Sequence, residues 1–289
     1  MDIHGFLKTH KLPSAYAETA QHWFIPLCDR VLEHQKSANK PFIVAINGCQ
    51  GSGKSTLTSF MSAYLSSEHD KSVVSLSIDD FYLSQSERRA LAIKVHPLLQ
   101  TRGVPGTHDT TLALKTLDAL HKPGNVALPR FEKSLDDPLP REQWPVVTSP
   151  PDIVILEGWC VGLPPQDDSK LKEAINELER DEDPLCIWRR FVNTELGGSY
   201  QTLFGLANYT TMLKAPSFDC VYKWRLEQEH KLAETAGTKG NKVMSDDEIS
   251  RFIAHYQRLT EHALQHLPAR CDTVFSLDEN RQITNQEIK

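Results

Sequence analysis

The sequence predicts an α/β fold in which a five-stranded parallel sheet is sandwiched by helices. Five short runs of residues are apolar along almost their whole length, which is typical of strands that helices cover on both faces. These runs alternate with amphipathic patterns that indicate helices, and this order favours a parallel sheet. No internal repeat or low-complexity linker divides the chain. We therefore expect residues 41–289 to form a single domain, with residues 1–40 as a helical extension packed on it.

The extension is predicted from an amphipathic pattern over residues 14–38, in which five apolar side chains fall on one side of a helix. They are Trp23, Phe24, Leu27, Val31 and Leu32. The first strand follows as "PFIVAIN" (41–47), and a helical pattern runs on to Tyr64 after a Gly-rich segment. "SVVSLSID" (72–79) is the second strand.

The middle of the chain is punctuated by Pro and Gly. We predict a loop and one helix in residues 98–120, and mostly loop in residues 126–145. "DIVILEGW" (152–159) is the third strand, and the charged stretch from Asp167 to Asp183 is interpreted as solvated surface.

The last third of the chain completes the alternation of strands and helices. "YTTMLKAP" (209–216) is the fourth strand and "VYKWRLEQEHKL" (221–232) a helix. After a loop rich in Gly, Lys and Thr, Ser245 with Glu248 three residues later forms a capping box that opens another helix. "DTVFSLD" (272–278) is the fifth strand.

Composition excludes several classes of protein. With 289 residues and a formal charge of −6, the chain is a poor match to broad nucleic-acid or anionic-membrane binding. No apolar run approaches the roughly 20 residues that cross a bilayer, and the N-terminus lacks a secretory pattern. Six scattered cysteines without a CxxC pair indicate reduced thiols and a cytoplasmic protein. His255, His262 and His266 are interpreted as ordinary helix residues, because no acid or Cys completes a metal set.

"GCQGSGKS", from Gly48 to Ser55, fits the pattern G-x-x-x-x-G-K-[ST] between a strand and a helix. Glycines allow successive N–H groups to face one anion, and the helix N-terminus adds its positive end. Lys54 is expected to reach the β- and γ-phosphates, and the Ser55 hydroxyl to bind Mg²⁺. The chain lacks a DxxG after a magnesium strand, NKxD and LSGGQ, which disfavours GTPases and transporter ATPases. The predicted triphosphate site comprises Gly48, Cys49, Gln50, Gly51, Ser52, Gly53, Lys54, Ser55 and Thr56.

Acids follow the second and third strands. "SIDDFY" (77–82) carries Asp79 and Asp80, and "ILEGW" carries Glu157. The carboxyl ends of parallel strands meet at one edge of the sheet, so these acids are expected beside the phosphates. One acid of the pair can accept the proton of an attacking hydroxyl, and Glu157 can hold Mg²⁺ with Ser55. A turn with a helix N-cap is the alternative interpretation of the pair.

These motifs, in this order and spacing, resemble the phosphoribulokinase/uridine kinase/pantothenate kinase group of P-loop kinases. "RGVPGTHD" (102–109), "LPRFEKS" (128–134), "VYKWRLEQE" (221–229) and "MSDDEISRFIAHYQRLTEH" (244–262) are similar to the D-glycerate 3-kinase branch. The resemblance spans Phe42 to Arg281. It implies a P-loop NTPase fold with a mobile helical lid over about 217–245, ATP and Mg²⁺ as cofactors, and Asp79 as the catalytic base. One departure concerns the acceptor, because "PRFEKS" has Phe131-Glu132 where the plant branch has Tyr-Asp.

Further site residues are expected on four segments. A carboxylate clamp is predicted for Arg130 and Lys133, with unpaired surface charge as the alternative. The lid residues Lys223 and Arg225 are expected to neutralise the transferred phosphoryl, with Arg225 counted as catalytic beside Asp79 and Lys54, unless they pair with Glu227 and Glu229 on the surface. By resemblance, Asn280 and Arg281 contact adenine, whereas Trp159 and Trp224 are expected to pack. The predicted acceptor residues are Asp80, Tyr82, Arg102, His108, Asp109, Arg130 and Lys133.

Together these features predict an ATP- and Mg²⁺-dependent kinase whose acceptor is a hydroxyl of a small polar metabolite, D-glycerate first. A nucleoside, pantothenate or sugar kinase of the same group is the nearest alternative. A regulatory nucleotide-binding ATPase without a small acceptor is a second. We expect a monomer or weak homodimer.

Overall fold

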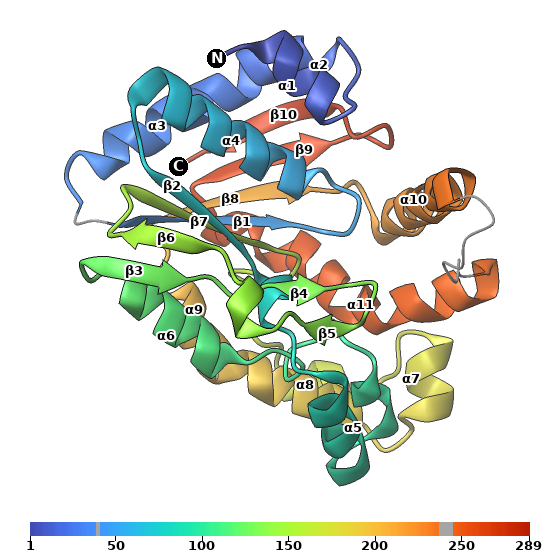
Figure 1. The fold of residues 1–289 in the computed structure, drawn as a ribbon. Coiled ribbons are helices and arrows are strands. Elements are labelled where there is room, and N and C mark those ends of the chain that lie inside the picture. The colour runs from blue at the N-terminus through green and yellow to red at the C-terminus, as the bar shows by residue number, and fades with distance from the viewer. Residues whose placement is uncertain (39–40, 237–244) are drawn as a thin grey trace.

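The central sheet of the computed structural model, which describes residues 1–38, 41–236 and 245–289, has six strands in the order β10-β9-β8-β1-β7-β2 (Figure 1). Five of them are parallel and confirm the predicted sheet. These are β1 (Phe42–Gly48), β2 (Val73–Ser77), β7 (Ile153–Gly158), β8 (Tyr209–Lys214) and β9 (Thr273–Leu277). The antiparallel edge strand β10 (Ile283–Ile288) was not expected, because its polar sequence lacks the apolar run used to find strands.

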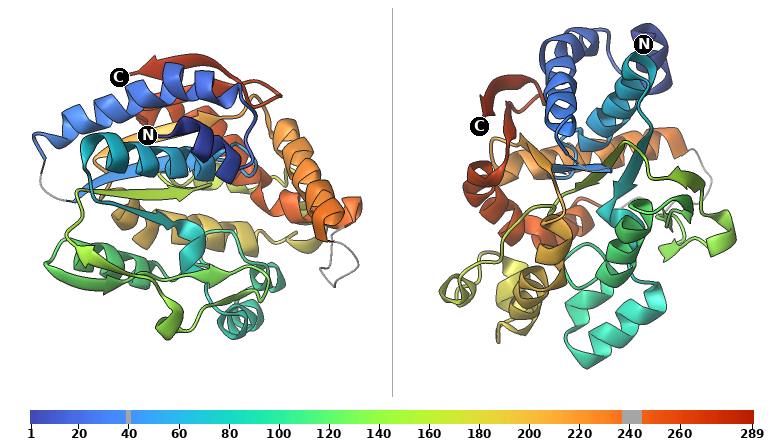
Figure 2. Two further views of the ribbon diagram at one scale, coloured as in Figure 1. Left: turned by 45° about the horizontal axis from the view of Figure 1, so that its top comes forward. Right: turned by 90° about the vertical axis from the view of Figure 1, so that its left-hand side faces the viewer.

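Helices cover both faces of the sheet, as Figures 1 and 2 show. Alternate residues of β1 enter different cores, because side chains along a strand point to opposite faces. Val44 and Ile46 pack with one set of helices, and Ile43 and Ala45 with the other. The first set comprises α1 (Ile3–Thr9), α2 (Tyr16–Thr19), α3 (Ile25–Gln35) and α4 (Lys54–His69). The second comprises α6 (Thr110–Leu120), α8 (Ile187–Gly197), α9 (Ser199–Phe204) and α11 (Asp246–His266).

The N-terminal pattern forms α2, a π-helical turn over Ala20–Phe24 and α3, instead of one continuous helix. Its apolar side is buried as the pattern predicts: Phe24, Leu27 and Val31 are at most 5% exposed. Phe24 packs against Phe60 of α4, with ring centroids 6.0 Å apart. The extension therefore contributes to the core on the α4 side of the sheet.

The segment between β2 and β7 holds more structure than expected. The helix α5 (Gln85–Lys94) precedes two small antiparallel ladders where mostly loop was predicted. These pair β3 (Gly124–Ala127) with β6 (Val146–Ser149), and β4 (Phe131–Glu132) with β5 (Asp137–Pro138). The strands are only two to four residues long, and β3, β4 and β5 include Gly, Pro or charged residues, so their sequences carry little strand signal. β6 is β-branched but only four residues long, and it follows the segment predicted as mostly loop.

The predicted lid begins with α10 (Phe218–Ala236), which is followed by residues 237–244 outside the described part of the chain. The first turns of α10 are buried: Cys220, Val221 and Trp224 are at most 3% exposed. This end of the helix is therefore packed into the core on the α4 side.

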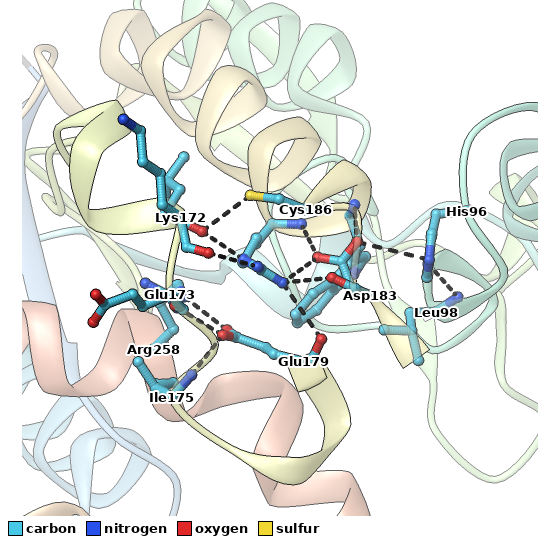
Figure 3. A network of polar contacts seen from close by, with 12 residues as sticks. His96, Leu98, Lys172, Glu173, Ile175, Glu179, Asp183, Cys186 and Arg258 are labelled. Carbon is cyan, nitrogen blue, oxygen red and sulfur yellow. Dashed lines mark hydrogen bonds and ion pairs between the residues drawn. The ribbon is translucent and has the colours of Figure 1, made fainter. Parts of the chain in front are cut away.

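The interpretation of residues 167–183 as solvated surface is wrong for two acids. Glu179, in α7 (Glu177–Glu182), and Asp183 are 0% and 1% exposed. Both oxygens of Glu179 accept hydrogen bonds from Arg258, at 2.7 and 2.6 Å, and Asp183 forms an ion pair with Arg189 at 3.0 Å (Figure 3). Buried carboxylates need such partners, and here the partners lie on helices that the local charge pattern does not include.

Within the described ranges, no helix has the length and apolar character needed to cross a membrane. The six cysteines are all buried and free, in agreement with the expectation of reduced thiols.

Candidate active site

The glycine-rich loop connects the end of β1 to the start of α4 at Lys54. Gly51 and Gly53 have φ angles of +78° and +91°, which other residues rarely adopt. A Cβ atom on Gly51 would lie 2.7 Å from Cβ of Trp224, so the loop passes directly over α10. No described side chain caps the N-terminus of α4. Its first N–H groups and the helix dipole are thus available to an anion.

Ser55 and Glu157 meet at the edge of the sheet. The Ser55 hydroxyl donates a 3.1 Å hydrogen bond to Oε1 of Glu157, whose residue is 8% exposed at the end of β7. Within the described residues, Oε2 of Glu157 has no hydrogen-bond donor. A buried carboxylate oxygen beside an exposed hydroxyl provides the oxygen ligands that Mg²⁺ prefers, so these two residues fit the metal expected with a nucleotide.

Asp79 lies in a 3₁₀ turn (Ile78–Phe81) that follows β2. Its Oδ1 accepts from the Tyr82 hydroxyl at 2.8 Å, and its Oδ2 from Nζ of Lys133 at 2.7 Å. Burial acts to raise the pKa of Asp79, but Lys133, Lys54 and the Tyr82 hydrogen bond outweigh it and lower the pKa below its usual value. Asp79 is thus an ionised carboxylate within the field of the loop lysine.

Asp80 has a different environment. Its Oδ2 accepts from the backbone N–H of Ser77 at 3.0 Å, which completes a capping box, and from Arg130 at 3.2 Å. Burial raises the pKa of Asp80 above its usual value despite these two donors. The alternative interpretation of the acid pair as a helix cap therefore describes Asp80, whereas Asp79 binds Lys133 and is influenced by the charge of Lys54.

His108 and Asp109 belong to the scaffold beneath Asp79. The His108 ring stacks on Tyr82, with centroids 4.5 Å apart, and its Nδ1 lies 2.6 Å from the Tyr200 hydroxyl. Burial lowers the pKa of His108 to about 4, so the ring is neutral near pH 7. Oδ1 of Asp109 accepts from the N–H of Leu112 at 2.8 Å and caps α6. Both are predicted to bind substrate, and the contacts seen here also hold the loop in place.

Arg102 and Arg225 line a cavity of about 620 Å³. The Arg102 guanidinium lies 5.5 Å from the Phe131 ring centroid and is hydrogen-bonded to Asp136, and that of Arg225 lies 5.3 Å from the Phe252 centroid. The charged and aromatic residues of its wall are Arg88, Arg102, Asp136, Glu182, Arg225, Arg251 and Phe252.

Tyr256 connects this cavity with Asp79. Its hydroxyl donates a 3.1 Å hydrogen bond to the carbonyl of Arg102. Burial and then Asp79 raise the pKa of Tyr256, and the charges of Arg102 and Arg225 oppose them. The charges of the carboxylate and of the two arginines therefore all act on one buried hydroxyl.

The turn between β9 and β10 contacts the glycine loop. Arg281 donates to the carbonyl of Gly51 at 3.0 Å and to Glu227 of α10 at 2.7 Å, and it lies over Trp224. Asn280 is exposed, with its N–H bonded to Asp278. The Lys223 ammonium lies 3.5 Å from Glu279 and is also exposed.

Surface pairing of the lid residues with Glu227 and Glu229 was the alternative interpretation. Glu227 pairs with Arg281, and Lys223 lies near Glu279, whereas the side chain of Glu229 lies outside the described part of the chain. Trp159 and Trp224 pack in the core, at 4% and 1% exposure.

Sequence reasoning missed Asp136, whose carboxylate binds both Arg88 and Arg102. The only local signal is the "DDP" sequence of a turn, because both partners lie more than 30 residues earlier.

No family model matches the sequence. The chain is 36% identical over 272 residues to the uncharacterized kinase mug58 of Schizosaccharomyces pombe, covering 87% of this chain and 94% of that protein. It is 30% identical over 259 residues to the probable ATP-dependent kinase TDA10 of Saccharomyces cerevisiae, with coverages of 83% and 84%. The chloroplastic D-glycerate 3-kinase of Arabidopsis thaliana is 30% identical over 255 residues, which are 81% of this chain and about half (52%) of that one.

Solved structures agree with these relatives. The YGR205w protein superposes with a TM-score of 0.75 at 27% identity, covering 92% of this chain and 97% of that one. A D-glycerate 3-kinase from Cryptococcus neoformans var. grubii has the same fold, with a TM-score of 0.75 at 24% identity and coverages of 96% and 100%. Given the similarity to mug58 and TDA10 over most of each chain, this protein belongs to the P-loop kinases, in the branch that contains the D-glycerate 3-kinases.

Proposed function

We propose that this kinase transfers the γ-phosphate of ATP to a hydroxyl of a small, negatively charged metabolite, with D-glycerate the first candidate. The observation that carries the proposal is Asp79, an ionised carboxylate that lies 2.7 Å from the Lys133 ammonium of the β4–β5 turn and whose pKa the charge of Lys54 in the phosphate loop helps to lower. A candidate base thus lies within the field of the loop lysine and beside a cation for the acceptor.

In the proposed reaction, the loop N–H groups and Lys54 hold the triphosphate. Ser55 and Glu157 would hold Mg²⁺, which would supply positive charge to neutralise the phosphates. Asp79 accepts the hydroxyl proton as the acceptor oxygen bonds to the γ-phosphorus and the bond to ADP breaks. A lid over residues 217–245 that brings Arg225 towards the phosphoryl group would exclude water.

The charge of the acceptor side supports an anionic substrate. Lys133 and Arg130 approach the two acids, while Arg102 and Arg225 line the adjoining cavity. Arginine forks and lysine ammonium groups are the usual ligands of carboxylates. Two of the relatives are named D-glycerate 3-kinases, and D-glycerate carries a carboxylate next to its hydroxyl groups.

A panel of acceptors tests this proposal. The purified chain is incubated with ATP, Mg²⁺ and either D-glycerate, L-glycerate, pantothenate, uridine or ribose, and each product is identified by mass. We expect a monophosphate of D-glycerate and no product from uridine or ribose. A phosphorylated nucleoside or sugar would contradict an anionic acceptor. ATP turnover that no acceptor changes would instead indicate a regulatory ATPase.

A further inference from the structure

The β4–β5 turn holds a lysine against the carboxylate that we assign as the base. Lys133 is the first residue after β4, and its ammonium lies 2.7 Å from Oδ2 of Asp79. The other oxygen, Oδ1, already accepts from Tyr82. In this arrangement the Lys133 ammonium occupies Oδ2, the oxygen that would accept the proton of an incoming hydroxyl.

The turn itself is fixed at its opposite side. The N–H of Gln85 donates to Asp137 at 2.7 Å, and its side-chain amide donates to the carbonyl of Leu135 at 2.9 Å. Arg88, which is 2% exposed, binds the carbonyl and the carboxylate of Asp136 at 2.9 and 2.8 Å. Since α5 holds this side of the turn, the position of Lys133 is set by the fold.

The Lys133 side chain, by contrast, is free to exchange partners. It is 63% exposed, whereas Asp79 is 28% exposed. Exposed ion pairs contribute little net stability, so a stronger competing anion can displace one partner. Arg130 differs, because it is 30% exposed and bonded to a capping carboxylate that is 17% exposed.

We propose that Lys133 couples acceptor binding to activation of the base: it binds Asp79 in the empty site and moves to the anionic group of the acceptor. This inference rests on the proposed function. Without an acceptor, the ammonium covers Oδ2, and water is a poor nucleophile at the γ-phosphorus. With an acceptor, Oδ2 is free to receive the hydroxyl proton while the oxygen–phosphorus bond forms and ADP leaves with the electrons of the broken bond. The same side chain would then have two effects: it would limit ATP hydrolysis in the absence of an acceptor, and it would select acceptors that carry an anionic group.

Asp79 has other charged and titratable neighbours, and these take no part in the exchange of Lys133 between Asp79 and the acceptor. Lys54 lowers its pKa from the α4 side and Tyr82 from its own turn. Four further groups whose titration Asp79 influences are Asp80, His108, Cys160 and Tyr256. Because none of them is altered by changing Lys133, a change in the pH dependence of a Lys133 variant reports on this contact.

The test compares Lys133→Met with Lys133→Arg in the full chain, with Lys94→Met, an exposed lysine at the end of α5, as a control. For Lys133→Met we expect the KM for D-glycerate to rise about 10- to 100-fold, with a much smaller change in kcat, because a hydrogen bond to a charged group is lost. ATP hydrolysis without acceptor should rise by about tenfold. Removing the ammonium raises the pKa of Asp79, so the acid limb of kcat/KM should move to higher pH. Lys133→Arg keeps a cation beside Asp79 and should change all three quantities less than Lys133→Met does. Lys94→Met should leave them unchanged.

The outcomes separate this inference from the proposed function. If the wild type phosphorylates D-glycerate but Lys133→Met leaves acceptor-free hydrolysis and the acid limb unchanged, the coupling role of Lys133 is wrong and the kinase assignment stands. A higher KM alone would make Lys133 a simple binding residue and also overturn the coupling. If the wild type phosphorylates no acceptor, the proposed function and the exchange fail together.

Discussion

Asp79 and Asp80 are neighbours in the sequence, yet their surroundings give them different tasks. Asp79 contacts two side-chain donors beside the phosphate loop, and Asp80 caps the turn that carries it. We predict that Asp79→Asn lowers kcat by roughly 10²- to 10⁴-fold with little change in ATP affinity, since an amide cannot accept the hydroxyl proton. Steady-state kinetics measure both quantities.

Asp80→Asn is the matched comparison for this residue. It keeps the shape of the cap but weakens the interaction with Arg130, so a loss of stability is expected to exceed any loss of chemistry. A large loss of kcat in Asp80→Asn with none in Asp79→Asn would reverse the two roles.

The loop lysine is a second test at the residue scale. Lys54 lies at the first position of α4 and acts on Asp79 through its charge. Lys54→Ala should lower kcat at least about 100-fold, because a cation that stabilises the transferring phosphoryl is removed. Circular dichroism and urea unfolding should stay close to wild type. Near-normal turnover in this variant would refute the assignment of the loop.

Residues in short local motifs were predictable, and residues defined by distant partners were not. Lys54, Ser55 and Glu157 follow from a glycine pattern and from acids at strand ends, which the sequence displays within a few positions. The cap roles of Asp80 and Asp109 also depend on residues close in the sequence. The sequence alone does not distinguish them from ligand-binding carboxylates, because an Asp at the same position serves either role. Asp136 was missed because Arg88 and Arg102 reach it from other elements.

At the scale of elements, the glycine loop depends on α10. Gly51 and Gly53 both have positive φ, but an added Cβ meets Trp224 at 2.7 Å from Gly51 and no described atom within 4 Å from Gly53. Both alanine variants should lose stability through backbone strain, of about 1–2 kcal/mol each. Gly51→Ala should lose more, because Trp224 is packed in the core and cannot move away freely.

Urea unfolding of the two variants measures this difference. Equal free energies of unfolding for Gly51→Ala and Gly53→Ala would show that the contact between the loop and α10 is loose.

Long elements were predicted better than short ones for a physical reason. The five parallel strands are apolar because both faces are covered, so their sequences identify them. The β3–β6 and β4–β5 ladders lie outside that sheet, where partial exposure permits polar residues and Pro. The β4–β5 turn carries Lys133, so the part of the site that we propose for the acceptor is also the part that the sequence predicts least well.

At the scale of the whole molecule, the layer beneath the sheet is held together by buried charges. Arg258 of α11 binds Glu179 of α7 and donates to the carbonyl of Glu173 at 2.6 Å (Figure 3). It also donates to the carbonyl of Lys170 at 2.8 Å. Arg189 of α8 reaches Asp183 and the carbonyl of Leu171. Arg189 joins α8 to the neighbouring segment that includes α7, and Arg258 joins α11 to Glu179, 79 residues earlier in the chain, so α7, α8 and α11 should unfold together.

Removing one partner of this network tests that cooperativity. Glu179→Ala leaves the Arg258 guanidinium buried, at 7% exposure, with carbonyl acceptors alone, and the free energy of unfolding should fall by about 3–5 kcal/mol. Glu177→Ala, on the same helix but with an 87% exposed side chain, should change it by less than about 0.5 kcal/mol. Urea unfolding monitored separately by tryptophan fluorescence and by circular dichroism measures both variants. A loss in Glu179→Ala no larger than in Glu177→Ala, or two probes that no longer coincide, would show that the buried charges do not unite these helices into one cooperative unit.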